Sequence, residues 1–295
     1  MNKNDYLSLL PKRPQEIHKN QCGKVAIIAG SLNYLGAALL ACKASLRTGS
    51  GLVYLLTIPS IGSFIQAQCP EIIFLPLNET KGGGIDSSST LLIKNYLKRY
   101  KIDVCCIGPG LGLNEDIRSL VRQSIKISQN LSIPIVLDAD GLNAVDMNFL
   151  AELSRYQIVL TPHVGEFKQL FSNFSNLVSD HENRKNICKM GASKLNQILV
   201  LKGHKTVISD GLNNCINQTG NSGLASAGMG DVLSGMIASF IGQGLSLYNS
   251  AVLATFMHGL AADLIYKTRD VSMLASDVVE SISNAYFFLK GHDHD

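Results

Sequence analysis

The residues best suited to chemistry lie in a glycine-rich segment, 217–235, which holds five glycines and one acid, Asp231. Glycines at Gly228 and Gly230 let the backbone approach a ligand closely. An apolar helix is expected to begin here, and its free N–H groups and positive dipole end favour an anion. The pattern predicts phosphoryl transfer, in which the N–H groups of Gly228, Met229 and Gly230 form an anion hole and Asp231 accepts a proton from the attacking hydroxyl.

The helix expected over 231–241 has apolar residues at a 3.6-residue spacing and a face of small residues opposite them. Such a helix is usually buried between other elements. Asp231 is therefore expected at its N-cap or first position, where the helix end lowers the basicity of a carboxylate. A purely structural capping role is the alternative, since Asp is a favoured cap. The polar entry 217–221 favours the ligand-binding interpretation.

Composition restricts the class of protein. The chain has 295 residues, of which 46% are hydrophobic and 17% charged, and its net charge is +3 with scattered basic residues. Nucleic-acid binding is not expected, because there is no basic block. Neither a secretion signal nor an apolar run of membrane-spanning length is present. The seven cysteines form no C-x-x-C pair, which indicates reduced core thiols in a cytoplasmic protein.

Short apolar runs alternate with helical patterns along the chain. Strands are expected at 24–29, 52–57, 72–75, 103–107, 135–137, 158–160, 198–201 and 206–209. Helices are expected at 36–47, 89–98, 115–128, 143–153, 165–171, 182–195, 231–241, 250–266 and 275–289. This alternation predicts an α/β fold with a mostly parallel sheet covered by helices on both faces, a three-layer sandwich. With no repeat or long linker, 1–295 is expected to form one domain, with 1–22 as an N-terminal extension.

Ligands of such sheets bind at the carboxyl ends of the strands, so the loops that follow the strands should form the site. These loops cover 30–38, 108–112, 138–144, 161–167 and 202–206, together with the glycine-rich run.

Several of these loops are ambiguous when taken alone. The G-P-G-L-G loop at 108–112 lacks the final glycine of G-x-G-x-x-G, because residue 113 is Leu. It is a weak indication of a dinucleotide redox fold, and a tight turn explains it equally well. The segment 202–206 offers two lysines and backbone N–H groups to nucleotide phosphates, or is a solvated basic turn. There is no P-loop motif.

Two further loops carry polar side chains. His163 follows Pro162 at the end of a strand and is a candidate ligand contact, although a loop histidine is often only polar surface. Asp138 and Asp140 directly follow a buried strand. They are candidates for ordering a metal-bound water or a phosphate, or for capping the next helix.

In chain order, these loops resemble the NAD(P)H-hydrate dehydratases of the ribokinase-like superfamily. The shared motifs are G-S-x-x-Y-x-G-A, G-P-G-L-G, D-A-D-x-L-N-A, T-P-H-x-G-E, K-G-x-x-T and N-x-T-G-N-x-G-x-x-x-x-G-x-G-D-V-L-S-G. They extend from about residue 23 to residue 263. The resemblance implies a repair activity, which removes the water added at C6 of the nicotinamide ring in the S epimer of NADHX or NADPHX.

The resemblance implies that a nucleotide drives that reaction, ADP in bacterial members of the family and ATP in eukaryotic ones. Mg²⁺ is expected to bridge the nucleotide phosphates, and the sequence assigns no residue as its ligand. The resemblance implies that Asp231 is the catalytic acid/base. It also implies that the hydrate contacts Ala37, Gly110, His163 and Asp231, and that the nucleotide contacts Lys202, Gly203, His204, Lys205, Thr206 and Gly230. A homotetramer is a further implication.

The chain departs from the family pattern at Met229, where the family usually has Thr. We expect activity to persist, because the backbone N–H groups remain. The roughly twenty residues before Gly23 are too few for the epimerase domain that many bacterial relatives carry, so a separate protein is expected to supply epimerisation. Two alternatives stay open: a small-molecule kinase of the same fold, and a degenerate nucleotide-binding oligomer.

Overall fold

A computed structural model describes residues 1–153, 155, 157–171 and 183–291. The strands are β1 (Lys24–Ile28), β2 (Leu52–Thr57), β3 (Ile73–Pro76), β4 (Val104–Ile107), β5 (Ile135–Leu137), β6 (Ile158–Leu160), β7 (Ile198–Leu201), β8 (Val207–Ser209) and β9 (Asn214–Ile216). The helices are α1 (Lys3–Leu9), α2 (Leu35–Arg47), α3 (Pro59–Gln68), α4 (Thr90–Tyr100), α5 (Glu115–Asn130), α6 (Asp140–Asn143), α7 (Met147–Ala151), α8 (Val164–Leu170), α9 (Arg184–Leu195), α10 (Met229–Gly242), α11 (Leu247–Arg269) and α12 (Ala275–Lys290).

Within the described residues, nine strands form one sheet in the order β3-β2-β1-β4-β5-β6-β7-β8-β9. All neighbouring pairs from β3 to β7 are parallel, whereas β7, β8 and β9 pair antiparallel. In the centre of the sheet, Ile27 aligns with Leu55 on one side and Cys106 on the other. All three side chains are fully buried, which is typical of parallel strands covered on both faces.

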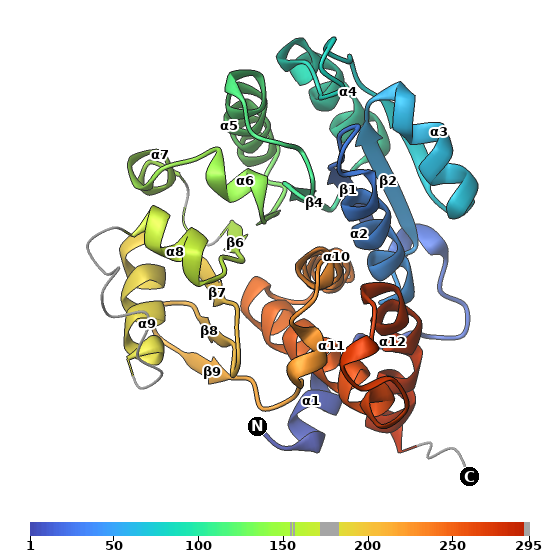
Figure 1. The fold of residues 1–295 in the computed structure, drawn as a ribbon, viewed down its shortest axis with the longest axis vertical. Helices are drawn as coiled ribbons and strands as arrows, with labels where there is room; N and C mark the ends of the chain where they lie inside the picture. Colours follow the sequence, from blue (N-terminus) through green and yellow to red (C-terminus); the bar gives the residue numbers. More distant parts are fainter. Residues whose placement is uncertain (154, 156, 172–182, 292–295) are drawn as a thin grey trace.

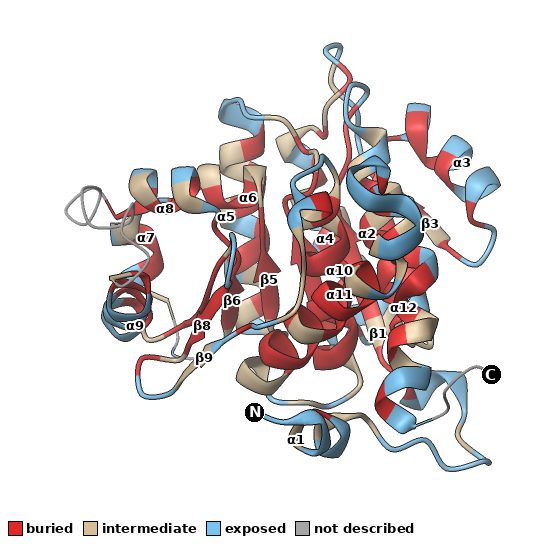
Figure 2. Cartoon of the chain, turned by 60° about the horizontal axis from the view of Figure 1, so that its bottom comes forward, coloured by how far each residue is buried: buried red, intermediate tan, exposed pale blue. Residues whose placement is uncertain are grey.

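Helices cover both faces of the sheet (Figure 1). The group α2, α10, α11 and α12 packs together on one face, and α4, α5, α7 and α9 lie on the other. Figure 2 shows the strands and the inner sides of these helices as the buried part of the molecule. The predicted three-layer α/β sandwich with a mostly parallel sheet is confirmed.

Several predicted elements differ from the observed ones. The helix expected over 143–153 is shorter, because α7 begins only at Met147, where the Asp146 side chain caps it by accepting from the Phe149 N–H at 2.9 Å. The preceding α6 lies in the segment 138–144 that was expected to be a loop, and it shares only Asn143 with the predicted helix. The helix expected over 182–195 is described from Arg184 onward, and Glu182 lies outside the described residues. The elements α1, α3 and β9 were not predicted. For α3 the sequence does contain an indication, because Pro59 occupies the first helical position, where proline is favoured.

No helix among the described residues has the length and apolarity needed to cross a membrane. The seven cysteines are all free, and six of them are buried. This agrees with their interpretation as reduced core thiols.

Candidate active site

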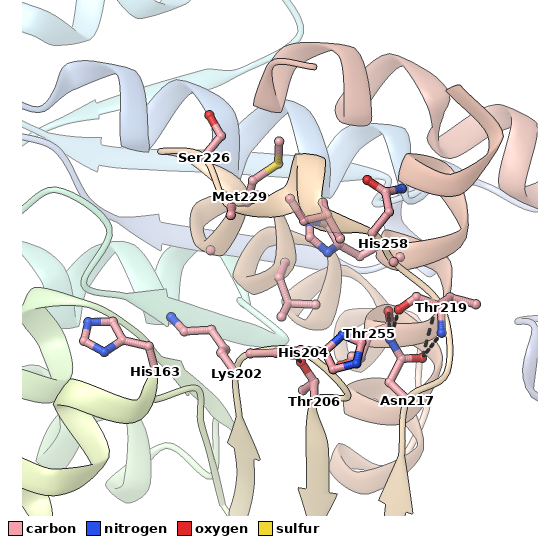
Figure 3. Close-up of a pocket in the computed structure, with 18 of the residues that line it drawn as sticks. His163, Lys202, His204, Thr206, Asn217, Thr219, Ser226, Met229, Thr255 and His258 are labelled. Carbon is pink, nitrogen blue, oxygen red and sulfur yellow. Dashed lines mark hydrogen bonds between the residues drawn. The ribbon is translucent and has the colours of Figure 1, made fainter. Parts of the chain in front are cut away.

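A cavity of about 770 Å³ opens at the carboxyl ends of the central strands. Its walls come from the loops that follow β5, β6 and β7, from the glycine-rich run, from the start of α10 and from α11. Figure 3 shows His163 and Lys202 on one side of the cavity and Asn217, Thr219 and Thr255 on the other. The predicted loops after β5, β6 and β7 and the glycine-rich run therefore meet at one cavity, as their positions at the strand ends imply.

The first turn of α10 faces this cavity through Gly228, Met229, Gly230 and Asp231. Gly228 precedes the helix with φ +86°, a left-handed conformation that glycine adopts without strain. The N–H groups of Met229, Gly230 and Asp231 donate to no acceptor among the described residues. The helix start therefore presents free donors and the positive end of its dipole to the cavity, which suits an anion.

Asp231 lies at the third position of α10, so its predicted place at the N-cap or first position is wrong. The helix begins two residues earlier because Gly228 makes the left-handed turn that precedes it. The predicted fall in basicity is also wrong. Burial, followed by the negative charge of Asp138, raises the pKa of Asp231 to about 7, against the opposing effect of Lys202. Loss of hydration is the largest cause of the shift.

Lys202 projects from the end of β7 between two buried carboxylates. Its Nζ lies 2.7 Å from Oδ1 of Asp138 and 3.8 Å from Oε2 of Glu166. Burial alone would lower the pKa of Lys202, but the charges of Asp138 and Glu166 raise it, so the ammonium persists. A methyl group at Gly230 would lie 3.3 Å from this Nζ, which places the cation beside the free N–H groups of α10.

Asp138 and Asp140 point to different partners because the residue between them, Ala139, has a positive φ of 47°. Asp138 accepts a bond from Thr161 Oγ1 at 2.7 Å in addition to Lys202, while Asp140 accepts from the Gly112 N–H at 2.8 Å. An alanine in this region is strained, and such strain is often retained at functional sites. Asp138 lines the cavity, whereas Asp140 holds the G-P-G-L-G loop through its bond with Gly112.

His163 lines the cavity and also caps α8. Its Nδ1 accepts from the N–H groups of Gly165 at 2.9 Å and Glu166 at 3.2 Å, and the Glu166 carboxylate accepts from the His163 N–H at 2.7 Å. This reciprocal capping box fixes the imidazole and leaves Nε2 as the nitrogen that carries the proton in the neutral ring. The sequence indicated a ligand contact here but not the capping role.

The loop after β7 lines the cavity with Gly203, His204, Lys205 and Thr206. Gly203 has φ +140° and Lys205 has φ +54°, so the backbone turns sharply at both residues. The Thr206 hydroxyl donates to the Gly203 carbonyl at 2.9 Å and closes the turn. All members of the predicted nucleotide set, including Lys202 and Gly230, therefore border one cavity.

Ala37 and Gly110 adjoin each other but are not part of the lining of this cavity. A methyl group on Gly110 would lie 2.6 Å from the Tyr34 carbonyl oxygen and 2.9 Å from the Ala37 methyl group. This close approach explains why the loop needs glycine at this position. The predicted hydrate contacts thus fall into two groups, His163 and Asp231 in the cavity and Ala37 with Gly110 beside it.

Sequence reasoning did not single out the polar residues that α11 contributes. Thr255 and His258 line the cavity, and burial lowers the pKa of His258 to about 4, which keeps its ring neutral. Asp263 accepts from the Gly220 N–H and from the Asn221 side chain, both at 2.8 Å. The signal in the sequence is three polar residues, Thr255, His258 and Asp263, in the otherwise apolar stretch 251–265 of this helix.

Among the described residues, no group of three His, Cys, Asp or Glu side chains is placed to hold a metal ion. Asp138 is already engaged with Lys202. The donor set therefore does not fit a metal held by protein ligands alone.

Free helix N–H groups, a cation held between two buried carboxylates and an acid with a raised pKa around one cavity define a nucleotide-binding α/β protein of the ribokinase-like fold. The family model described as NAD(P)H-hydrate dehydratase matches residues 25–284. The chain belongs to that family.

Individual relatives agree with this assignment. The chain is 35% identical over 266 residues to a bifunctional NAD(P)H-hydrate repair enzyme of Dictyoglomus turgidum, covering 90% of this chain and 50% of that protein. It is 31% identical over 261 residues to an ADP-dependent (S)-NAD(P)H-hydrate dehydratase of Staphylococcus aureus, covering 88% and 87%. The chain spans about half the length of the bifunctional relatives that it matches.

A solved structure is similar over nearly the whole length. The ADP/ATP-dependent NAD(P)H-hydrate dehydratase of Bacillus subtilis, crystallised with ATP and Mg²⁺, has a TM-score of 0.82 and 26% identity. The alignment covers 98% of this chain and 97% of that one.

Proposed function

We propose that this protein dehydrates the S epimer of hydrated NADH or NADPH at the expense of an adenine nucleotide, as a carbon–oxygen lyase that restores NAD(P)H. The observation that carries the proposal is the position of Asp231. It is an acid with a pKa near 7, three residues into a helix whose N–H groups are unpaired among the described residues and face the same cavity. A base and an anion site at one place suit transfer of a phosphoryl group to a hydroxyl.

In the first step, the C6 hydroxyl of the hydrate attacks the terminal phosphorus of the nucleotide, and Asp231 accepts the hydroxyl proton. With ADP, the bond to AMP breaks. The N–H groups of Met229 and Gly230 stabilise the charge on the moving phosphoryl group. Phosphate then leaves C6 as the ring-nitrogen lone pair moves toward that carbon, and loss of a proton from C5 restores the dihydropyridine.

We assign the nucleotide to the Lys202–Thr206 side of the cavity and the hydrate to the side lined by His163. Ala37 and Gly110, which lie outside the lining, would meet the part of the hydrate that extends beyond the cavity. Lys202 would compensate phosphate charge, because its ammonium is held beside Gly230 by two carboxylates. ADP is the proposed donor, and ATP is the alternative. The residues present form no metal site of their own, so Mg²⁺ enters the proposal only as the counter-ion of the nucleotide.

The test is recovery of reduced-nicotinamide absorbance from purified S-NADHX with Mg²⁺ and either ADP or ATP. Recovery with one nucleotide identifies both the reaction and the phosphoryl donor. Asp231→Asn should lower kcat by about 10²–10⁴-fold, the usual contribution of a general base. Asp210→Asn is the matched control, because Asp210 accepts backbone N–H bonds at the turn between β8 and β9 and does not line the cavity.

The same assay separates the two alternatives. A stable phosphorylated product without recovery of NADH would indicate a small-molecule kinase of this fold. Nucleotide binding without turnover would indicate a degenerate nucleotide-binding protein. Met229, where the family usually has Thr, would then be the substitution that accompanies the loss of catalysis.

We place the protein in the cytoplasm as a homo-oligomer, a tetramer by analogy with the family, acting alongside a separate epimerase that supplies the S epimer. The relatives named bifunctional NAD(P)H-hydrate repair enzymes support this partnership, because they carry a second repair activity in the same chain. Light scattering of the purified protein measures the oligomeric state.

A further inference from the structure

Arg184, the first residue of α9, is a buried arginine whose guanidinium group donates to three backbone carbonyls. Its side chain is 5% exposed. Nη1 donates to the His204 carbonyl at 2.6 Å, and Nη2 donates to the carbonyls of Leu201 at 3.1 Å and Lys202 at 3.0 Å. No carboxylate of the described residues lies within ion-pair distance of it. This is unusual, since buried charged side chains are normally paired with opposite charges.

These bonds orient three peptide planes, and two of them bear on the cavity. The described peptide bonds are trans, so each N–H points opposite to the carbonyl in its own plane. The carbonyls of Lys202 and His204 point toward Arg184, and the N–H groups of Gly203 and Lys205 therefore point away from it. Both residues line the cavity. Neither N–H donates to an acceptor among the described residues.

The loop adopts this shape against its intrinsic preference. Gly203 and Lys205 both have positive φ, and a non-glycine residue such as Lys205 is strained there. A methyl group on Gly203 would lie 3.0 Å from Nη2 of Arg184, so the backbone approaches the guanidinium closely. Three charge-assisted bonds to one planar group are well suited to hold such a turn in place.

We propose that Arg184 is a positioning residue that holds the loop so that the N–H groups of Gly203 and Lys205 bind anionic phosphate oxygens of the nucleotide. Arg184 itself touches no substrate. The inference rests on the proposed function, because it takes the occupant of the cavity to be a nucleotide. It adds the reason why two backbone N–H groups of this loop face the cavity.

The test compares the binding of AMP and adenosine by calorimetry in the full chain and in two variants, Arg184→Lys and Arg184→Met. The two ligands differ only in the phosphate. The dissociation constant of adenosine divided by that of AMP therefore reports how much the phosphate contacts contribute to binding. We expect both variants to reduce this ratio by about tenfold, the value of a charge-directed hydrogen bond, with kcat at saturating ADP changed less than about threefold. Arg118→Lys is the control. Arg118 lies on α5, does not line the cavity and likewise donates to a backbone carbonyl, that of Asn143, at 2.9 Å.

An unchanged ratio in both variants overturns the inference, and so does an equal weakening of AMP and adenosine, which would indicate a general collapse of the loop. Wild-type protein that binds no adenine nucleotide would instead refute the proposed function. A measurement on the wild type keeps the test valid if the variants do not fold. The amide resonances of Gly203 and Lys205 should shift with AMP and not with adenosine, and the absence of that difference contradicts the assignment.

Discussion

Asp231 shows how the surroundings of one residue set its chemistry. At the start of a helix in water, a carboxylate would be a weak base. Here the side chain is partly buried, lies near Asp138 and has a pKa of about 7. A base with this pKa is half deprotonated at neutral pH and still holds a proton well.

The pH dependence of kcat follows from this pKa. Asp231 must be deprotonated to accept the hydroxyl proton, so kcat should fall as the pH drops below about 7 and level off above it. The measurement is kcat at saturating substrate between pH 5 and pH 9, within the stable range of the hydrate. Asp231→Asn should remove this limb, and a rate that increases toward acid pH would contradict the assignment of Asp231 as the base.

The same shift predicts a gain in stability when the acid is removed. The pKa of Asp231 is raised above its unfolded value, so the native state binds the proton more tightly and this group destabilises the fold as pH rises through about 4 to 7. Asp231→Asn should therefore be more stable than wild type at pH 8, by about 1–3 kcal/mol, and nearly equal to it at pH 4. Urea unfolding at the two pH values measures the difference, and equal effects at both would contradict the shift.

Met229 combines a free backbone N–H with a side chain that is 5% exposed and belongs to the core. Met229→Thr restores the residue usual in the family and leaves the N–H in place. We expect kcat to change less than about threefold and stability to fall by about 1–3 kcal/mol through lost packing. Met236→Thr, in the buried part of the same helix, is the control for packing. A large rate gain would instead show that the hydroxyl contributes to catalysis.

At the scale of elements, α11 acts as the scaffold of the glycine-rich loop. The Asn217 side chain donates to the Thr255 carbonyl at 3.3 Å, and the Thr219 hydroxyl donates to the Phe256 carbonyl at 2.8 Å. Asp263 accepts two more bonds from the loop. The run of glycines is therefore not a free segment but a wall of the cavity attached along one helix.

Asp263→Asn tests this attachment. Asn can accept only one of the two bonds and places an NH₂ group against the other donor, so the loop should loosen. We expect the nucleotide KM to increase about five- to tenfold and stability to fall by about 1–2 kcal/mol, with kcat nearly unchanged. Steady-state kinetics and thermal melting measure both effects. Asp210→Asn is again the control, and an unchanged KM for Asp263→Asn would show that the loop holds its shape without this residue.

At the scale of the whole molecule, the N-terminal segment packs on the same body as the site. Tyr6 of α1 is 4% exposed and stacks on Phe256 of α11, with ring centroids 3.7 Å apart. The carbonyl of Phe256 is the acceptor for Thr219, so α1 supports the rear of the helix whose other side lines the cavity. The first residues thus contribute to the core.

Tyr6→Ala should lower the free energy of unfolding by about 2–4 kcal/mol, because it removes a buried aromatic side chain and its stack. Tyr6→Phe, the control, keeps the ring and should cost much less. Denaturant unfolding of the two variants gives the comparison. Equal losses would assign the effect to the hydroxyl rather than to the stack.

The sequence by itself determined the elements and most of the site. Apolar runs and glycine-bounded loops predicted eight strands to within one residue at each end, and the mostly parallel sheet. They do so because a strand that is buried on both faces is apolar along its whole length. The glycine-rich run and three of the five predicted loops, those after β5, β6 and β7, line the cavity, whereas Ala37 and Gly110 lie beside it. The structure places Lys202, His163 and Asp231 there together.

Tertiary structure decided what depends on neighbours distant in the sequence. The pKa of Asp231 follows from burial and from Asp138, more than ninety residues away, which no local pattern records. The roles of Arg184 and Asp263 depend on which backbone groups the fold brings to them. The late start of α7 depends on one side chain, Asp146, which caps the helix at Met147 rather than at residue 143, where the apolar pattern predicts its start. Periodicity predicts elements because it is local, whereas desolvation and hydrogen bonding between loops exist only after the chain has folded.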